Sequence, residues 1–462
     1  MTVGIIGGGL AGLAAGCALS DAGYKVTLFE RRPYLGGRAS SYEHPATGEV
    51  LDNCQHVLLG CCTNLIDFYR RLGVEDKIRW YDRLTFIAPD GKRGEIGVSS
   101  IPAPFHASPS FASFSLLSLT DKLAIGRAML ALVEQVPQDT KSTSFLQWLR
   151  SRGQTQRAID RFWGPILVSA LNEELDRVSV YYGAMVFRDA FLKSAEAGRM
   201  GVPTVPLSDL YGQAVGYITE RGGAVHLRAS VDSFEPADNS AGIFVNGERR
   251  TFDFVVPAVP YQGIERLLPE TPASDSIRAR LHEFQSSPIT GIHLWFDREF
   301  TQLDHAVLLD RTIQWMFQKS RIQTGRISGP LAAGSYLELV VSSSKSLLDR
   351  NRTEIIELAM RELAEFFPEV KQARLLKGTV VKEVHATFSP SPGLEAYRPP
   401  AATPWPRVFL SGDWTNTGWP ATMEGAVRAG YASAQALAAS LGDPRTFLIP
   451  DLASKGFMRV FG

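Results

Sequence analysis

The chain lacks the features that would place it in several large classes of protein. Its four cysteines (Cys17, Cys54, Cys61 and Cys62) all lie near the N-terminus and have no metal-binding spacing, so neither a disulfide framework nor a metal site is expected. Lys plus Arg equal Asp plus Glu at 48 each, whereas a nucleic-acid-binding protein would normally show a basic excess. We therefore predict buried thiols in a reduced, cytoplasmic protein that has no nucleic-acid partner.

Long hydrophobic runs are also missing. The longest apolar run, from Val3 to Leu19, is interrupted by glycines and is too short to span a bilayer. The first predicted strand begins almost at Met1, which leaves no room for a signal peptide, and no internal repeat or low-complexity tract is present. The 462 residues, 45% of them hydrophobic, are enough for two or three domains with large cores. We expect a soluble protein, or one attached only to a membrane surface.

A glycine-rich turn near the N-terminus is the first feature that indicates a function. An apolar strand over residues 3–6 leads into the turn at 7–12, and a helix rich in alanine and leucine follows from 13 to 22. A second strand ends in Glu30, whose carboxylate would accept hydrogen bonds from a ribose diol. The G-x-G-x-x-G spacing brings the backbone close to a pyrophosphate at the positive end of the helix. The alternatives are a purely structural turn and a solvated carboxylate. The predicted phosphate-binding residues are Gly7, Gly9, Leu10, Ala11 and Gly12.

The residues after Glu30 distinguish FAD from NAD. They read Arg-Arg-Pro-Tyr-Leu-Gly-Gly-Arg and resemble the E-(x)6-GGR extension of the flavin amine oxidase and carotenoid desaturase superfamily. In that superfamily the glycine pair and the arginine line the FAD pyrophosphate, so the resemblance assigns Arg31, Gly36, Gly37 and Arg38 to cofactor binding. A flexible Gly-Gly turn would allow a fork-shaped guanidinium to face two phosphates. The alternative is a basic surface loop.

A second signature of the same superfamily lies near the C-terminus. A predicted strand that begins at Val408 ends in Gly412-Asp413, and a helix is predicted to begin near Thr422-Met423. The resemblance implies that Asp413 binds the ribityl or phosphate part of FAD. It also implies that the N–H groups at the start of this helix point at the flavin pyrimidine, where negative charge develops when the ring is reduced. Because no cysteine follows Cys62, we expect the FAD to be bound non-covalently.

The resemblance covers essentially the whole chain and implies an α/β fold. This fold has a Rossmann-like FAD-binding domain and a discontinuous substrate domain, made of a mixed sheet and a helical lid, as in amine oxidases and phytoene desaturases. Superfamily members place backbone near Val231 against the adenine. Residues 243–245 and 252–256 are predicted to form a hairpin around Asn246-Gly247. The predicted division assigns 1–80, 203–268 and 389–446 to the FAD-binding domain, 81–202 and 269–388 to the lid and substrate domain, and 447–462 to a tail.

Residues 51–60, Leu-Asp-Asn-Cys-Gln-His-Val-Leu-Leu-Gly, resemble the D-N-G-Q-H-x-x-x-G segment of hydroxysqualene dehydroxylases. Cys54 stands where that pattern has glycine. In the superfamily this segment passes beside the isoalloxazine ring, so Gln55 and His56 are predicted to border the flavin, and Gln55 is also a candidate catalytic residue. Asp52 lies four residues before His56, and its carboxylate would orient the imidazole if the segment turns. His56 is the first candidate for a general acid, the alternative being a histidine that is hydrogen-bonded for structure.

A second segment carries the same resemblance. Residues 163–172, from Trp163 to Asn172, resemble the W-x-P-L-x-x-A-x-L-N segment of these dehydroxylases. They lie in a largely helical region, 144–196, that in relatives forms a lid over the substrate tunnel. Asn172 and Glu173 are therefore candidates for polar groups that point into the tunnel. Equally, they are ordinary residues at the end of a helix.

Two apolar segments are candidates for membrane contact. Residues 101–118 are rich in proline and aromatic residues and almost free of charge, and 447–461 form an apolar tail. Such segments either dip into a membrane surface, with Phe111 and Phe114 as candidate contacts, or are covered by the protein itself. The first alternative predicts peripheral attachment to the inner face of the cytoplasmic membrane.

The resemblance implies reductive dehydroxylation of hydroxysqualene to squalene, in squalene and hopanoid biosynthesis. An acid protonates the allylic hydroxyl, water leaves, and N5 of reduced FAD delivers a hydride. The reductant of FAD is unidentified, because no second nucleotide fingerprint is present. The alternatives are a carotenoid-type desaturase, which runs the hydride the other way, a non-catalytic isoprenoid-binding protein, and an amine oxidase. An amine substrate is disfavoured because Thr422 stands where amine oxidases usually have an aromatic residue.

Overall fold

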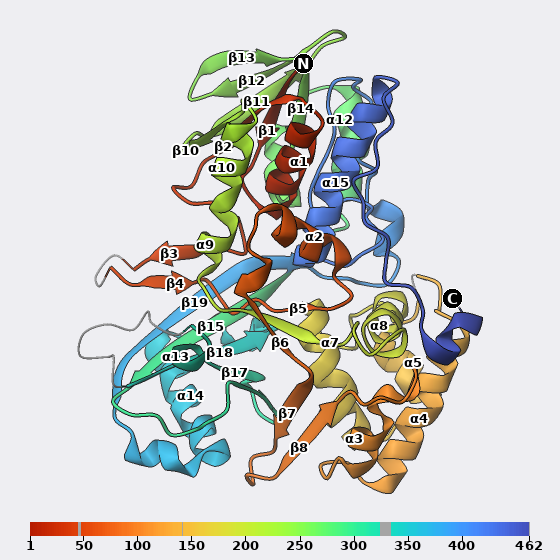
Figure 1. Ribbon diagram of the computed structural model, residues 1–462, viewed down its shortest axis with the longest axis vertical. Helices are drawn as coiled ribbons and strands as arrows, with labels where there is room; N and C mark the ends of the chain where they lie inside the picture. Colours follow the sequence, from red (N-terminus) through yellow and green to blue (C-terminus); the bar gives the residue numbers. More distant parts are fainter. Residues whose placement is uncertain (45–47, 141, 324–333, 462) are drawn as a thin grey trace.

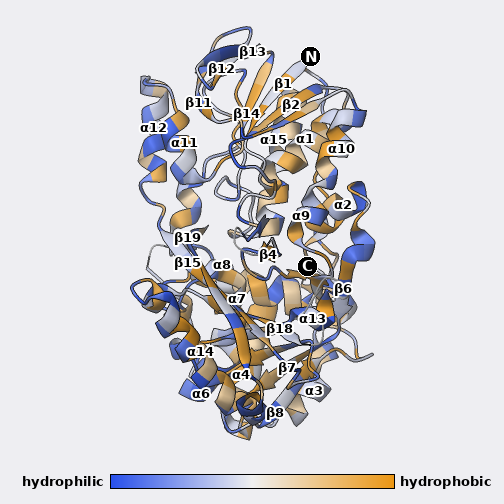
Figure 2. Ribbon diagram, turned by 90° about the vertical axis from the view of Figure 1, so that its left-hand side faces the viewer, coloured by the Kyte–Doolittle hydropathy of each residue, from blue (hydrophilic) through white to orange (hydrophobic). Residues whose placement is uncertain are grey.

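The computed structural model describes residues 1–44, 48–140, 142–323 and 334–461. Two lobes follow one another along the long axis of the molecule (Figure 1). The upper lobe contains the N-terminal strands and α15 (Met423–Ser440), and the lower lobe contains a large sheet and the helices of residues 100–200. Apolar residues dominate the inner strands, whereas α12 (Pro272–Leu281) and β13 (Glu248–Phe252) contain many hydrophilic residues (Figure 2). Among the described residues, no helix is long and apolar enough to cross a membrane.

The upper lobe is built around a parallel sheet. In the described residues it has four strands in the order β10-β2-β1-β14. Helices α1 and α15 pack together so closely that a Cβ on Gly430 would lie 2.4 Å from the carbonyl oxygen of Ala11. Val3, Ile5, Val26 and Leu28 are completely buried, because helices cover the sheet. The strands are β1 (Thr2–Ile6), β2 (Lys25–Glu30), β10 (Ala224–Leu227) and β14 (Phe254–Pro257), and α1 spans Leu10–Asp21.

The predicted hairpin is only partly correct. Strands β11 (Val231–Pro236), β12 (Ala241–Val245) and β13 (Glu248–Phe252) form an antiparallel sheet. The turn is Asn246-Gly247 as predicted, with positive φ at both residues. The assignment of 252–256 as the second strand is wrong, because a two-residue turn places Glu248 directly opposite Val245. The apolar run after Phe252 instead forms β14, which pairs with β1.

The segment at 408–410 lies along the free edge of β14. Phe409 N donates to the carbonyl of Val255 at 3.0 Å, and Ser411 N donates to that of Pro257 at 3.0 Å. Val408 forms a parallel strand-type bridge with Val255, and Phe409 forms an antiparallel one with Ala402. This pairing brings Gly412-Asp413 to the carboxyl end of the parallel sheet, the edge where open α/β sheets bind their ligands.

The lower lobe contains a mixed sheet. Seven strands of the described residues follow the order β19-β15-β18-β17-β16-β7-β8, and β16 and β7 are the parallel neighbours. Leu337, Leu339 and Val341 of β18 pack against α14 (Arg352–Phe366), while Tyr336 and Val340 belong to clusters on the other face. The strands are β7 (Arg83–Ile87), β8 (Arg93–Gly97), β15 (Ser286–Phe296), β16 (His305–Leu308), β17 (Trp315–Gln318), β18 (Ser335–Ser342) and β19 (Leu375–Phe388).

Helices between residues 108 and 192 pack beside this sheet around a second large core. Trp163 is completely buried there, and its ring meets that of Phe187 edge to face. This core contains α3 (Ser108–Ser113), α4 (Leu119–Glu134), α5 (Phe145–Ser151), α6 (Gln156–Ala158), α7 (Gly164–Leu171) and α8 (Val180–Val186). The connecting elements are β3 (Ser41–Glu43), β4 (Val50–Asp52), β5 (Leu58–Leu59), β6 (Ile78–Tyr81), β9 (Met200–Pro203), α2 (Thr63–Arg71), α9 (Leu207–Tyr211), α10 (Gln213–Glu220), α11 (Tyr261–Leu267) and α13 (Lys319–Ile322).

Candidate active site

The glycine turn and the Gly-Gly-Arg segment lie against each other. Gly36 N donates to the carbonyl of Gly8 at 2.8 Å, and Gly7 has a φ of +110° that favours glycine. A Cβ on Gly12 would lie 2.0 Å from the carbonyl oxygen of Gly7, whereas one on Gly9 would come no closer than 3.8 Å to a neighbouring atom. Gly12 therefore allows α1 to approach the strand, and Gly9 keeps the backbone open for a phosphate. Helix α1 has no side-chain cap at Gly9, so its first N–H groups are available to an anion.

Glu30 is buried at the end of β2. Its carboxylate accepts hydrogen bonds from Gly8 N and Arg32 N, both at 2.7 Å. Each oxygen keeps further lone-pair capacity for a ribose hydroxyl. Ala229 N donates to the Glu30 carbonyl at 2.9 Å, which brings the start of β11, with Val231, close to the same strand end. The predicted roles of Glu30 and Val231 stay predictions, and so does that of Arg31, whose side chain is exposed.

The N-terminal and C-terminal signatures meet through one ion pair. Arg38 Nη2 donates to Asp413 Oδ1 at 2.6 Å, and Arg38 Nη1 donates to the carbonyl of Ala386 at 3.0 Å. Asp413 is almost fully buried, while 28% of the Arg38 side chain is exposed. The guanidinium is therefore oriented by a carboxylate and still accessible on one side, as a phosphate-binding arginine requires.

The start of α15 lies at the same site. Thr422 is its N-cap, and its hydroxyl accepts a hydrogen bond from Gly425 N at 3.0 Å. Tyr211 donates its hydroxyl to Met423 Sδ at 3.4 Å. The Glu424 carboxylate is directed away toward α2, where it accepts from Leu65 N at 2.7 Å. The helix thus starts at Thr422 as predicted, and the remaining N–H groups of its first turn can face a ligand.

Asp52 orients a lysine rather than His56, so that part of the prediction is wrong. Asp52 Oδ2 accepts from Lys319 Nζ at 2.8 Å, and Oδ1 accepts from Ser41 Oγ and from Leu207 N. Burial acts to raise the pKa of Asp52, but Lys319 and these hydrogen bonds outweigh it, so the pKa is lowered. Burial likewise acts to lower the pKa of Lys319, and the nearby carboxylates outweigh it. The pair is ionised, and Lys319 Nζ also donates to Gln55 Oε1 at 2.8 Å.

His56 makes a local contact. Its Nδ1 lies 2.8 Å from the carbonyl oxygen of Cys54, and since a carbonyl only accepts, Nδ1 carries the proton and Nε2 is left as an acceptor. Burial lowers the pKa of His56. A neutral imidazole is a poorer proton donor than an imidazolium, so the geometry weakens the case for His56 as the general acid, although its role stays a prediction.

Glu338 joins this cluster and was not among the predicted site residues. It lies in the middle of β18, opposite His293 of β15, and its Oε2 is 3.4 Å from Lys319 Nζ. Its side chain is completely buried. Burial raises its pKa to about 7, with Asp52 adding to the rise and Lys319 opposing it. The sequence feature that could have identified Glu338 is its position as a charged residue within the apolar run Leu-Glu-Leu-Val-Val. Such a residue indicates either an internal ion pair or a functional group.

Asn172 and Glu173 contact a different set of residues. Asn172 ends α7 in the left-handed conformation, with a φ of +53°, and its amide donates to Ser287 O and Thr387 Oγ1 and accepts from Ser343 N. Glu173 is buried and paired with Lys345 and Arg177. These contacts fasten the lid helix to the sheet, and a contact of either residue with substrate stays a prediction.

The four cysteines are free thiols, as predicted. Cys17, Cys54 and Cys61 are buried and Cys62 is half-buried. At Cys54, the position where the related pattern has glycine, the side chain lies close to β15, because a Cβ on Gly291 would come within 3.4 Å of Cys54 Cβ. The small thiol therefore fits between the 51–60 segment and the sheet.

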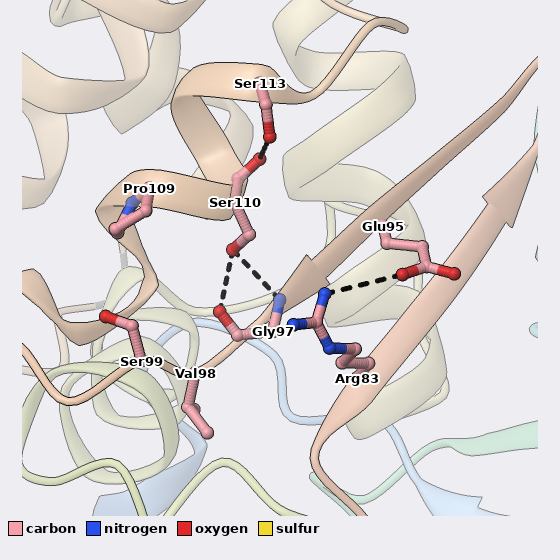
Figure 3. A pocket seen from close by; sticks show the side chains of 8 residues that line it. All are labelled: Arg83, Glu95, Gly97, Val98, Ser99, Pro109, Ser110 and Ser113. Carbon is pink, nitrogen blue, oxygen red and sulfur yellow. Dashed lines mark hydrogen bonds and ion pairs between the residues drawn. The ribbon is translucent and has the colours of Figure 1, made fainter.

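A cavity of about 350 Å³ lies elsewhere, between β8 and α3 (Figure 3). Ser110 Oγ closes one side of it through hydrogen bonds with the backbone N and O of Gly97. None of the cavity residues belongs to the flavin motifs or to the Asp52 cluster, so this cavity is not the candidate active site. Its lining residues are Arg83, Glu95, Gly97, Val98, Ser99, Pro109, Ser110 and Ser113.

The model of the flavin-containing amine oxidoreductase family matches residues 10–438. The chain belongs to this family. A 15-cis-phytoene desaturase from Synechococcus elongatus is 28% identical over 460 residues, covering 95% of this chain and 96% of its own. A probable zeta-carotene desaturase from the same organism is also 28% identical, over 475 residues, covering 95% and 98%.

Solved structures of this amine oxidoreductase fold superpose on the chain. An oxidoreductase from Methanosarcina mazei gives a TM-score of 0.71 at 19% identity, covering 93% of this chain and 99% of its own. A putrescine oxidase bound to putrescine gives 0.71 at 17% identity, covering 95% and 99%. These likenesses confirm the predicted α/β fold, with a Rossmann-type parallel sheet and a mixed substrate-domain sheet. Membership of a flavin-containing family also confirms an FAD-dependent oxidoreductase, and the open backbone at Gly9 and the partly exposed Arg38 fit that cofactor.

Proposed function

We propose that this family member catalyses the reductive dehydroxylation of hydroxysqualene to squalene. The observation that carries the proposal is the buried cluster of Asp52, Lys319 and Glu338, next to the segment that resembles hydroxysqualene dehydroxylases. Loss of an allylic hydroxyl needs a proton donor in a site that excludes water. A buried group whose pKa is near 7 supplies such a donor at neutral pH.

The surroundings of the cluster suit a hydrocarbon. Phe317, the neighbour of Glu338 on β17, packs with Val340 and with Met200 and Val202 of β9. These apolar side chains would keep water from a cationic intermediate. When bound, FAD supplies the two-electron chemistry and exchanges a hydride with the substrate. Gly9, Arg38, Asp413 and the start of α15 would hold this cofactor non-covalently, and its reductant is a separate, unidentified partner.

A carotenoid-type desaturation is the second candidate. The two Synechococcus elongatus relatives are named for this activity and align over nearly the full chain. Desaturation would use the same apolar surface and the same cofactor, but it would remove a hydride and a proton from a saturated carbon pair. The direction of proton and hydride transfer therefore separates the two candidates. The wider assignment, an isoprenoid substrate, is common to both.

The test compares two substrates in two redox states. Purified protein with chemically reduced FAD should convert hydroxysqualene to squalene, detected by mass spectrometry, and should release intact FAD on acid denaturation. With oxidised FAD and phytoene, no conjugated polyene should appear in the visible spectrum. Polyene formation without squalene formation would select the desaturase instead. His56→Ala should keep bound flavin and lose turnover if His56 takes part, and unchanged turnover would remove His56 from the mechanism.

We also propose that the protein docks on the inner face of the cytoplasmic membrane, where its substrate resides. The two apolar segments lie against each other, because Phe457 N donates to Ala103 O at 2.8 Å and the rings of Phe105 and Phe457 meet edge to face. Both rings remain exposed. Phe114 is buried and Phe111 is partly buried against the lid core, so they are poor candidates for membrane contact. Exposed leucines on α4 (Leu119, Leu123 and Leu130) add to the apolar surface of this lobe.

A further inference from the structure

Two buried polar groups on the sheet face beneath residues 52–56 are incompletely hydrogen-bonded. Glu338 Oε2 lies 3.4 Å from Lys319 Nζ as an ion pair, but within the described part of the chain neither carboxyl oxygen accepts a well-aligned hydrogen bond, and His293 Nε2 has no partner. The two residues are direct neighbours across β15 and β18, so their side chains share one face with Cβ atoms roughly 5 Å apart. Unsatisfied buried polar groups are costly, and a pair of them on one face indicates that a polar group of a ligand completes the site.

The charges around Glu338 favour transfer of a proton. Lys319 faces it from α13 at 3.4 Å and is already bonded to Asp52 and Gln55. The positive charge of Lys319 and the negative charge of Asp52 sum to zero. The buried cluster of three residues is therefore neutral when Glu338 is protonated, and it carries one negative charge when Glu338 is ionised. The titratable groups that face it are Asp52 from β4, Lys319 from α13, His293 from β15, Tyr336 from its own strand, Tyr42 from β3 and Cys54 from the 51–60 segment.

We propose that the Glu338 carboxyl group donates a proton to the isoprenoid substrate in dehydroxylation, or accepts one from it in desaturation. The Lys319 ammonium stabilises the Glu338 carboxylate. This role rests on the proposed function. It assigns Asp52 to positioning, because Asp52 keeps Lys319 charged and in place. His293 is kept neutral, since burial lowers its pKa to about 3, so it can accept a hydrogen bond from the substrate hydroxyl but cannot supply the proton.

In dehydroxylation the Glu338 O–H bond breaks and its proton moves to the allylic hydroxyl oxygen. The C–O bond then breaks with its electron pair on oxygen, and water leaves. The vacant orbital on carbon is filled by a hydride, so one equivalent of an external two-electron reductant is consumed. Glu338 remains as a carboxylate beside Lys319 until solvent returns a proton, and in desaturation the same carboxylate would accept the proton instead.

The decisive variant is Glu338→Gln in the full-length, FAD-loaded protein, and Glu362→Gln is the matched control. Glu362 is also a buried carboxylate, but it accepts from Ile313 N on the α14 face of the sheet. Infrared difference spectra between about pH 6 and about pH 8 report a protonated carboxyl group through its C=O stretch. This band should be lost at the higher pH in the wild type and in the control, and should be missing from Glu338→Gln. A band unchanged by Glu338→Gln would overturn the proposal.

Turnover provides the second measurement. Squalene formation by the wild type should fall as the pH rises through about 7, whereas Glu338→Gln should be at least about 100-fold slower and insensitive to pH in this range. Wild-type turnover by Glu338→Gln, on hydroxysqualene or on phytoene, would overturn the role of Glu338. A wild type that desaturates phytoene but makes no squalene would refute only the proposed function, and loss of that desaturation in Glu338→Gln would still support Glu338. If Glu338→Gln does not fold, Glu338→Asp takes its place in both measurements. We expect Glu338→Asp to turn over more slowly than the wild type and still to depend on pH. A turnover rate equal to that of the wild type would count against the proposal.

Discussion

Arg38 and Asp413 form an ion pair of 2.6 Å although 375 residues separate them in the chain. The pair joins the Gly-Gly-Arg segment to the loop that precedes α15. Asp413 is nearly buried and Arg38 is partly accessible, so the carboxylate holds the guanidinium with one side free for a phosphate.

Replacing Arg38 by methionine should weaken flavin binding by about 10- to 100-fold, because a charge-assisted hydrogen bond contributes roughly 1.5–3 kcal/mol. The measurement is the flavin absorbance that stays with the protein through gel filtration, followed by titration of the apoprotein with FAD. Arg445→Met is the control, since Arg445 pairs with Asp443 at the exposed surface. Equal flavin retention by the two variants would contradict the assigned role of Arg38.

Alanine at Gly9 and at Gly12 should give different defects. At Gly12 the new Cβ meets the Gly7 carbonyl oxygen at 2.0 Å, and we expect the apoprotein to lose about 1–3 kcal/mol of stability from overpacking. At Gly9 the new Cβ has space in the protein but lies where a phosphate would approach the backbone. The melting temperature of the Gly9→Ala apoprotein should therefore equal that of the wild type, while FAD binding is lost. Thermal melts of both apoproteins, with FAD titrations, test the pair. A destabilised Gly9→Ala apoprotein would contradict the assignment.

The pKa of Glu338 predicts a pH dependence of stability. The folded protein retains this proton up to about pH 7, whereas the unfolded chain releases it near its ordinary value of 4.5. The folded state therefore binds more protons in this window, and its stability should fall as the pH rises from about 4.5 to about 7, by up to roughly 3 kcal/mol. Urea midpoints of the wild type and Glu338→Gln measure this, and Glu338→Gln should lack the decline. A decline of equal size in both proteins would exclude Glu338 as its source.

Asn172→Ala separates a structural role from a catalytic one. The change removes three hydrogen bonds to the sheet and places alanine at a φ of +53°, for an expected loss of about 3 kcal/mol. Asn172→Gly should lose less, since glycine adopts that conformation readily. Turnover per bound flavin should persist in both variants if Asn172 only fastens the lid. Loss of turnover at unchanged stability would instead support contact with substrate.

Membrane docking predicts that the double change Phe105→Ser and Phe457→Ser releases the protein from vesicles. Each apolar side chain buried in a bilayer contributes about 1.5–3 kcal/mol, so flotation with anionic liposomes should weaken by at least about 100-fold. Leu376→Ser is the control, because Leu376 is an exposed residue of β19 in the sheet region. Equal flotation of the three proteins would refute docking through this surface.

The motifs that bind the cofactor were predictable because their chemistry is local. The glycine turn with its flanking strand and helix, Glu30 and the cap at Thr422 each follow from residues within about 25 positions of one another. The hairpin at 246–247 was assigned to the wrong second strand because Phe252 and the run after it look continuous in sequence, and only the two-residue turn fixes the register. The contact between Asp52 and Lys319 depends on how β4 meets α13, which no local pattern determines. For the same reason, nothing in the sequence paired Glu338 with Lys319, and Glu338 was not predicted as a site residue.

The strand order β10-β2-β1-β14 has a consequence for biosynthesis. The two N-terminal strands leave the ribosome first, but their partners on either side are translated about 200 residues later, and α15 about 170 residues after that. At about 5–20 residues per second, the nascent chain waits many seconds with an incomplete nucleotide-binding unit and uncovered apolar helices. Such delayed pairing is slow and prone to aggregation, so efficient production should depend on chaperones and on FAD being present when translation ends.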